Sequence, residues 1–402
     1  MVEIDLCLFE LPNPALENPR MYTPLGNLYL LSSVKNAGFN AQILDFRETI
    51  GEIPQAKFYG FSCTTPQINI AKTLAKQVSG KTIVGGAHPS LLPNDCTEFD
   101  YIIRGEGEEV LLNILSGRIS EGIVNAPRIQ NLDSIPLPAW DDVSEPFSST
   151  LYTGERYGEG DISMAIIASR GCPWACSFCG NIYRKIYFRS VGNIIKEIKE
   201  LIKRGVEHFR FVDDNFTLHP QFLDLCKELK KLHIHYRCHT RSDLIKDFLA
   251  KALKDSGCEE CSLGIESADP NVLSLNNKKE GIESHRRACR ILKETKIKVK
   301  FYWMSGLPGE TDETIQLNKE FMKITKPEKW TLSTFTPYPG CAVFNHPERF
   351  GVKIINPNFE NWWNFVFNVR DLNLPDREGY VHQLEGQTLE EMKARHDDFY
   401  YF

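Results

Sequence analysis

The sequence predicts an α/β protein with two domains, each built on a parallel β-sheet. Apolar, strand-like segments alternate with helical segments along two stretches of the chain, and this alternation is typical of parallel sheets covered by helices. A segment rich in proline and aspartate, without a clear period, separates the two stretches. The length of 402 residues also fits two domains better than one.

The first predicted domain covers residues 1–140. We expect strands and helices to alternate through it, with strands at 4–11, 40–46, 57–63, 81–88 and 100–105 and helices at 25–35, 69–80 and 108–117. Helices on both faces would make a doubly wound, Rossmann-like sheet, which binds ligands beyond the carboxyl ends of its strands. Candidate binding residues collect there: Thr64, Thr65, Gly85, Gly86, His88 and Gly105. Gly85 and Gly86 would permit a bulky ligand to approach the backbone closely.

Residues 141–160 are expected to link the domains, and the second domain covers residues 161–345. Six strand-like segments lie in or just before βα units, at 164–169, 208–214, 234–241, 261–267, 298–308 and 330–340. In βα barrels the chemistry lies at the carboxyl ends of the strands. Polar and glycine residues gather there: Asp213, Asp214, Arg241, Glu266, Ser267, Gly306 and Pro308.

Residues 346–402 form an aromatic-rich C-terminal extension. Trp362, Trp363, Phe365 and Phe367 lie in it. We expect the extension to close the mouth of the second domain or to pack on the first domain.

The composition excludes several classes of protein. Hydrophobic residues make up 42% and charged residues 25% of the chain, which are ordinary globular values. A net charge of −6 gives no basic surface for nucleic acid. No run of about 18 apolar residues is present. We expect the acidic N-terminal segment not to act as a signal peptide. Twelve cysteines therefore indicate a reducing cytoplasm and metal chemistry rather than disulfides.

The most specific motif is the Cys-x3-Cys-x2-Cys series of Cys172, Cys176 and Cys179, in a loop that follows the strand at 164–169. A structural zinc ion or a 4Fe–4S cluster normally takes four protein ligands. Three close cysteines without a nearby fourth cysteine or histidine favour a 4Fe–4S cluster that has one open iron. The alternatives are a zinc ion completed by a remote ligand, or three buried structural cysteines.

This spacing after a strand resembles the radical S-adenosylmethionine (radical SAM) superfamily. The resemblance implies a partial, TIM-like (β/α)6 barrel, and an open iron that chelates the amino and carboxylate groups of SAM. One electron would then cleave SAM to a 5′-deoxyadenosyl radical. The implied SAM contacts are Phe178, Asp213, Asp214, Arg241, Glu266, Ser267, Gly306 and Pro308. Two structural alternatives stay open, in which Arg241 pairs with Asp243 or Glu266 and Asp213 caps the following turn.

The first domain is similar to the cobalamin-binding domain that precedes many radical SAM cores. The segments YTPLG, LLSSVKNAGF, ILD, GGAHPSLLP and DYIIRGEGE carry the resemblance, in this order. It implies cobalamin contacts at the candidate residues of this domain. The Asp-x-His-x-x-Gly motif that supplies a lower cobalt ligand in other carriers is missing, because Arg47 and Ile50 replace the histidine and the glycine. We expect His88 to pack near the corrin rather than to bind cobalt.

Together the two resemblances imply a cobalamin-dependent radical SAM methyltransferase. One SAM would methylate the cobalamin, and a second would start hydrogen abstraction from an unactivated carbon of a small-molecule or peptide substrate. A low-potential flavodoxin or ferredoxin would supply electrons. The alternatives are a cyclase or rearrangement enzyme, a non-catalytic iron–sulfur or corrinoid sensor, and a methylthiotransferase whose second cluster uses Cys7, Cys63 and Cys96.

Cys258-x2-Cys261 is a second cysteine motif. It could be half of a zinc site or of another cluster, but no second pair matches it in the sequence. We interpret both residues as structural, like Cys226, Cys238 and Cys289. No residue is assigned as the catalytic one.

Overall fold

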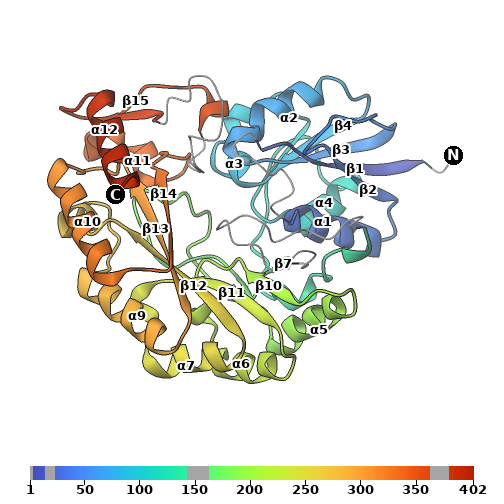
Figure 1. Cartoon of the computed structure of the whole chain (residues 1–402). Coiled ribbons are helices and arrows are strands. Elements are labelled where there is room, and N and C mark those ends of the chain that lie inside the picture. The colour runs from blue at the N-terminus through green and yellow to red at the C-terminus, as the bar shows by residue number, and fades with distance from the viewer. Residues whose placement is uncertain (1–2, 14–22, 143–162, 363–379) are drawn as a thin grey trace. The chain divides into compact units, whose positions relative to one another are not determined.

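The structure is a computed structural model, which describes residues 3–13, 23–142, 163–362 and 380–402. The chain divides into a first unit, at residues 1–152 and 156–165, and a second unit, at residues 153–155 and 166–402 (Figure 1). From residue 143 onward the expected linker lies outside the described residues, as do Trp363, Phe365 and Phe367 of the expected extension.

The first unit contains a six-stranded sheet in the order β2-β1-β3-β4-β5-β6, with parallel neighbours. Its strands are β1 (Ile4–Glu10), β2 (Ala41–Asp45), β3 (Ala56–Ser62), β4 (Lys81–Gly85), β5 (Tyr101–Arg104) and β6 (Gly122–Asn125), and its helices are α1 (Leu25–Asn36), α2 (Ile68–Ala75), α3 (Ala87–Leu91) and α4 (Gly107–Leu115). The strand order reverses between β1 and β3, and such sheets bind ligands at this point, beyond the carboxyl ends of the strands.

The burial of the first sheet follows from its sequence. Four consecutive residues of β1, from Leu6 to Phe9, are buried, as required of a central strand that is covered on both faces. The doubly wound sheet is therefore confirmed. The sequence did not predict β6, which is a short edge strand whose Ile123 is 45% exposed.

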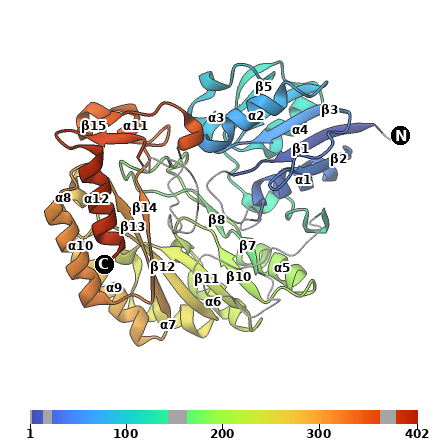
Figure 2. The same cartoon turned by 45° about the horizontal axis from the view of Figure 1, so that its top comes forward.

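A second six-stranded sheet has the order β14-β13-β12-β11-β10-β7, so that neighbouring strands follow one another along the chain. It belongs to the second unit, except that residues 163–165 of its edge strand β7 are grouped with the first unit. Its strands are β7 (Ser163–Ile166), β10 (His208–Phe211), β11 (His235–Thr240), β12 (Cys258–Glu266), β13 (Lys298–Ser305) and β14 (Lys329–Thr334), with α5 (Val191–Ile202), α6 (Phe222–Lys230), α7 (Asp247–Asp255), α8 (Pro270–Leu275), α9 (Ile282–Glu294) and α10 (Asp312–Thr325) between them. The strands from β10 to β14 pair in parallel, and the helices line the outer face of the curved sheet (Figure 2). The six predicted strands and the partial barrel are confirmed.

Smaller elements flank the loop that contains the three cysteines and follow the last strand of the barrel. A two-stranded ribbon joins β8 (Ser169–Arg170) to β9 (Tyr187–Phe188), and α11 (Ala342–Asn345), β15 (Val352–Ile354), β16 (His382–Leu384) and α12 (Leu389–Tyr400) come last. The described end of the chain packs on its own unit, where Phe399 lies edge-on to Trp303 of β13 at 5.1 Å and Asp398 pairs with Lys319 of α10 at 2.6 Å. No helix within the described ranges is long and apolar enough to cross a membrane.

Candidate functional site

The three cysteines lie in the loop from Gly171 to Gly180, which we call the cysteine loop. Its start is fixed by Asp213 at the end of β10, whose carboxylate accepts hydrogen bonds from the Ala168 amide at 3.0 Å and from the Ser169 hydroxyl. The Cys172 amide donates to the carbonyl of Tyr183 at 3.0 Å. Gly171 has φ of +109°, and a Cβ atom there would lie 2.5 Å from the Lys185 carbonyl oxygen. Only glycine lets the returning chain come so close.

The surroundings of the thiols suit ligands of an iron–sulfur cluster. Burial raises the pKa of all three thiols, that of Cys179 to about 11. Groups that stabilise thiolates oppose this: a backbone amide donates to Cys172 and another to Cys179, and the Lys278 ammonium lowers the pKa of Cys176. The Asn215 amide also donates to Cys172 Sγ at 3.5 Å. Thiolates are the form that binds iron, so this donor set fits the cluster.

No three His, Cys, Asp or Glu side chains in the described part of the chain are arranged to hold a single metal ion. A 4Fe–4S cluster does not require that arrangement, because each of its cysteines binds a different iron.

Glu266 and Lys278 form a charged pair at the end of β12. Glu266 has φ of +64°, which is unusual for a residue other than glycine and often marks a functional site. Its carboxylate lies 3.5 Å from Lys278 Nζ. A Cβ atom on Gly264 would lie 2.4 Å from the Glu266 carboxylate and 3.2 Å from Lys278 Nζ, so both side chains cover this glycine. Burial raises the pKa of Glu266, whereas the Lys278 ammonium lowers it.

Lys278 and its second partner Glu280, at 3.1 Å, were missed by the sequence reasoning. Both residues are buried. The segment NNKKE that contains them looks like an ordinary solvated loop in the sequence, and no signal in it marked the two side chains.

Arg241 is held by several groups of the second unit. All three guanidinium nitrogens donate hydrogen bonds, to Asp243 at 3.1 and 3.2 Å and to the carbonyls of Lys278 and Lys279 at 3.1 and 3.2 Å. The guanidinium also lies over the ring of Trp174, 4.2 Å from its centroid. The structural alternative in which Arg241 pairs with Asp243 is confirmed, and a SAM contact stays a prediction.

Of the other residues predicted to contact SAM, Phe178 is part of the cysteine loop and Asp214 lies close to its end. Asp214 accepts a hydrogen bond from the Asn181 amide at 3.3 Å, and its charge adds to the raised pKa of Cys172 and Cys179. Phe178 packs against a hydrophobic cluster that includes Leu307. Asp213 instead points to the start of the loop, and burial raises its pKa to about 6.

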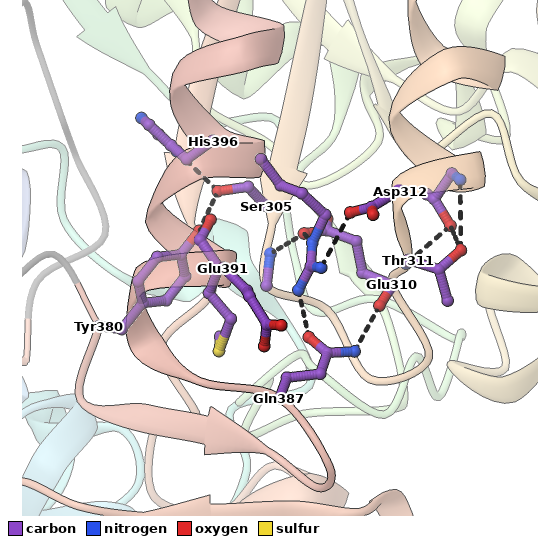
Figure 3. A network of polar contacts seen from close by, with 12 residues as sticks. Ser305, Glu310, Thr311, Asp312, Tyr380, Gln387, Glu391 and His396 are labelled. Carbon is purple, nitrogen blue, oxygen red and sulfur yellow. Dashed lines mark hydrogen bonds and ion pairs between the residues drawn. The ribbon is translucent and has the colours of Figure 1, made fainter.

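The loop after β13 contains Gly306 and Pro308 and is held by the C-terminal segment. The Gly306 amide donates to Glu310 at 3.0 Å, and the Gly306 carbonyl lies 2.8 Å from His382 Nε2. Figure 3 shows the surrounding network, in which the Ser305 hydroxyl lies 2.7 Å from both Tyr380 and His396. The sequence did not predict these contacts. Ser267, at the end of β12, is buried and accepts a hydrogen bond from the Asp269 amide.

In the first unit, the candidate residues join the loops that follow β3, β4 and β5. Gly86 has φ of +100°, and its Cβ atom would lie 2.7 Å from the Cys63 carbonyl oxygen. The Ser90 hydroxyl donates to the Gly86 carbonyl at 2.6 Å and accepts from the Gly105 amide at 3.0 Å. Gly85 has more space around it, because a Cβ atom added there would contact only Ile103, at 3.8 Å. These loops present small residues at the carboxyl edge of the sheet, which suits a large planar ligand such as cobalamin.

His88 and the Thr64-Thr65 pair have partners within this unit. The ring nitrogens of His88 lie 3.3 Å from the Thr65 hydroxyl and 3.1 Å from Asp95, and the ring is fully buried. Burial lowers the pKa of His88. The Thr64 amide and hydroxyl both donate to Gln67. This geometry favours the interpretation of His88 as a packed residue over that of a cobalt ligand.

Arg47 stands where other carriers have the cobalt-binding histidine. Its guanidinium turns back to Asp45 and donates to both carboxylate oxygens, at 2.8 and 2.6 Å.

The other nine cysteines are buried. Burial and the neighbouring Cys96 raise the pKa of Cys63, whereas Cys7 lies on β1 and accepts a hydrogen bond from Gln42 at 3.6 Å. Cys258 and Cys261 are buried in β12, where Cys258 lies 4.0 Å from Cys238. None of the twelve cysteines forms a disulfide.

Two family models match this chain. The model of the radical SAM superfamily matches residues 166–322, and that of the B12 binding domain matches residues 19–115. The chain therefore belongs to the radical SAM superfamily and carries an N-terminal B12-binding domain. It is a radical SAM enzyme of the cobalamin-dependent class, and its cofactors are a 4Fe–4S cluster, SAM and cobalamin.

Individual relatives agree with this assignment. An uncharacterized methyltransferase of Pyrococcus horikoshii is 28% identical over 367 residues, which cover 80% of this chain and 78% of the relative. The anaerobic magnesium-protoporphyrin IX monomethyl ester cyclase of Rubrivivax gelatinosus is 28% identical over 383 residues, covering 85% of this chain and 65% of the cyclase. The radical SAM methyltransferase TsrM of Kitasatospora setae, solved with tryptophan and a SAM analogue, has the same fold, with a TM-score of 0.71 and 16% identity over 99% of this chain and 89% of TsrM.

Proposed function

We propose that this protein is a methyltransferase that transfers a methyl group to an unactivated carbon of a small-molecule or peptide substrate. One observation supports this proposal most directly. A cysteine loop with thiolate-stabilising donors lies beside the Glu266–Lys278 pair, in which Lys278 is buried and Glu266 partly buried, in a chain that also has a B12-binding domain.

When bound at Cys172, Cys176 and Cys179, the cluster would supply the electron for cleavage of SAM, and cobalamin would supply a carrier for the methyl group. We propose that the chain's own residues bind and orient SAM. Glu266 and Lys278 offer opposite charges that complement the ammonium and carboxylate of its methionyl group. Arg241 keeps the carbonyls of Lys278 and Lys279 in place. Phe178 and the loop at Gly306 and Pro308 provide an apolar side for the adenine.

A radical cyclase is the second candidate. The match to the cyclase of Rubrivivax gelatinosus, over 85% of this chain, favours it. Both candidates would use the same cofactors, so the products must distinguish them.

The proposal includes a low-potential electron donor of the flavodoxin or ferredoxin type and a location in the cytoplasm. Twelve cysteines without a disulfide support a reducing compartment.

The test is an anaerobic assay of the protein reconstituted with iron, sulfide and hydroxocobalamin and supplied with SAM and a strong reductant. We expect about four irons and one cobalamin per chain, together with 5′-deoxyadenosine and S-adenosylhomocysteine. The latter forms only when a methyl group leaves SAM, so deoxyadenosine alone would favour the cyclase. Bound cofactors without either product would contradict enzymatic activity. The Cys176→Ala variant should lose the cluster and deoxyadenosine but retain cobalamin.

A further inference from the structure

Asn276 directly follows α8 and is 1% exposed. Both the oxygen and the nitrogen of its side-chain amide form hydrogen bonds. The oxygen accepts a hydrogen bond from the Ser177 hydroxyl at 2.9 Å. The nitrogen donates to the carbonyl of Val272 and to that of Pro308, each at 2.9 Å. A single side chain therefore joins the cysteine loop to the loop that follows β13.

Ser177 is the residue next to Cys176 in the cysteine loop, and its polar groups are fully engaged. Its amide donates to the Asn276 carbonyl at 2.9 Å, and its hydroxyl donates to the Asn276 side chain. The Ser177 carbonyl accepts a hydrogen bond from the Val343 amide at 3.2 Å. The position of Cys176 consequently depends on groups that Asn276 supplies.

The segment around Asn276 is itself constrained. Asn277 and Lys279 have φ of +51° and +54°, a backbone region that costs free energy for residues with a side chain. Asn277 donates from its side chain to the Ala175 carbonyl at 2.6 Å, and Arg241 holds the carbonyls of Lys278 and Lys279. These contacts keep the strained conformation in place, so the segment cannot slide relative to the cysteine loop.

We propose that Asn276 is a positioning residue that sets the cysteine loop against the loop at Gly306 and Pro308. It thereby fixes the distance between the cluster and SAM. This inference rests on the proposed function, in which the protein uses both the cluster and SAM. An amide suits the position because it accepts on one side and donates on the other. An aspartate of the same shape keeps the acceptor for Ser177 but loses both donors, and it also places a negative charge beside two carbonyl oxygens.

The test compares Asn276→Asp and Asn276→Ala with Asn271→Ala, which changes an exposed asparagine of α8. For each reconstituted protein, iron content, thermal unfolding, the EPR spectrum of the reduced cluster with and without SAM, and the kcat and KM for deoxyadenosine formation are measured. We expect Asn276→Asp to fold and to bind about four irons. Its EPR response to SAM should be reduced, and its kcat/KM for SAM should fall by roughly tenfold or more. The control should stay within about twofold of the wild type.

A wild-type EPR response and an unchanged KM in Asn276→Asp would overturn the inference. If Asn276→Ala fails to fold, Asn276→Asp alone decides. If the unmodified protein forms no deoxyadenosine, the proposed function fails, but the EPR comparison still tests whether Asn276 controls how SAM meets the cluster.

Discussion

Gly86 is the N-terminal flanking residue of α3, with φ of +100° and ψ of −165°, a conformation that is essentially restricted to glycine. A Cβ atom there would lie 2.7 and 2.8 Å from backbone atoms of Cys63, which cannot move aside like a side chain. At Gly85 the nearest atom would be Ile103 Cβ at 3.8 Å. The two adjacent glycines should therefore differ sharply in their tolerance of a side chain.

We expect Gly86→Ala to lower the free energy of unfolding of the first unit by about 2–4 kcal/mol. The matched variant Gly85→Ala should cost less than about 1 kcal/mol. Urea denaturation followed by circular dichroism measures both values, and a cobalamin titration shows whether the loop still binds. Equal losses in the two variants would show that the close approach to Cys63 is not what Gly86 provides.

At the residue scale, the sequence predicts those functional residues that are marked by their spacing along the chain. The three cysteines are of this kind, because their interval and their position after a strand are read directly from the chain. Lys278 and Asn276 are of another kind. Asn276 matters through its hydrogen bond with the distant Ser177, and Lys278 through its ion pairs with Glu266 and Glu280. A lysine or asparagine in a polar loop gives no sign of such burial. Arg241 is a third case. The sequence predicted that it contacts SAM, whereas in the structure its side chain donates hydrogen bonds to Asp243 and to the Lys279 carbonyl.

At the scale of elements, α12 is held against the loop after β13 through Glu310. This carboxylate accepts a hydrogen bond from the Gly306 amide at 3.0 Å and lies 3.8 Å from Arg395 of α12 (Figure 3). Burial raises its pKa from 4.5 to about 7, although the Gly306 amide and Arg395 oppose the rise. Between these two pKa values the folded protein holds a proton that the unfolded chain has released. Stability from this group is therefore lost as the pH rises from about 5 to about 8.

Glu310→Gln should remove this dependence, because glutamine keeps an acceptor for Gly306 but cannot ionise. The free energy of unfolding of the wild type, relative to the variant, should fall by on the order of 2–3 kcal/mol between pH 5 and pH 8. The difference between the two proteins isolates Glu310, since Asp213 and Glu10 also have raised pKa values and are present in both. Parallel stability curves would indicate that Glu310 is already ionised in the folded protein at pH 5.

The sequence predicted the order of the strands and helices better than it predicted how they pack on one another. The main strands carry long apolar runs that identify them, whereas β6 and the C-terminal elements are short and acquire their conformation from neighbours. The attachment of α12 through Trp303, Lys319 and Glu310 depends on tertiary contacts that no local pattern reports.

At the scale of the whole molecule, each of the two compact units has its own sheet and hydrophobic core, apart from the edge strand β7, whose residues 163–165 are grouped with the first unit. One core contains Leu6, Leu31 and Ile83 of the first unit, and another contains Leu307, Phe335 and Tyr380 of the second. Because each core is complete within its own unit, we expect thermal unfolding in two transitions rather than one. A ligand that binds only one folded unit should then stabilise only that unit.

Calorimetry under anaerobic conditions tests this expectation. Hydroxocobalamin at about 100 times its Kd should stabilise the first unit by about 2.7 kcal/mol and leave the other transition in place. Reconstitution with iron and sulfide should raise the midpoint temperature of the second unit's transition only. Cys176→Ala should abolish this rise, but cobalamin should still raise the midpoint temperature of the first unit's transition. Gly86→Ala should lower the midpoint temperature of the first unit's transition only, which is the transition that cobalamin stabilises. A single transition that responds equally to both cofactors would mean that the units unfold together, so that the stability of each cofactor site depends on the other.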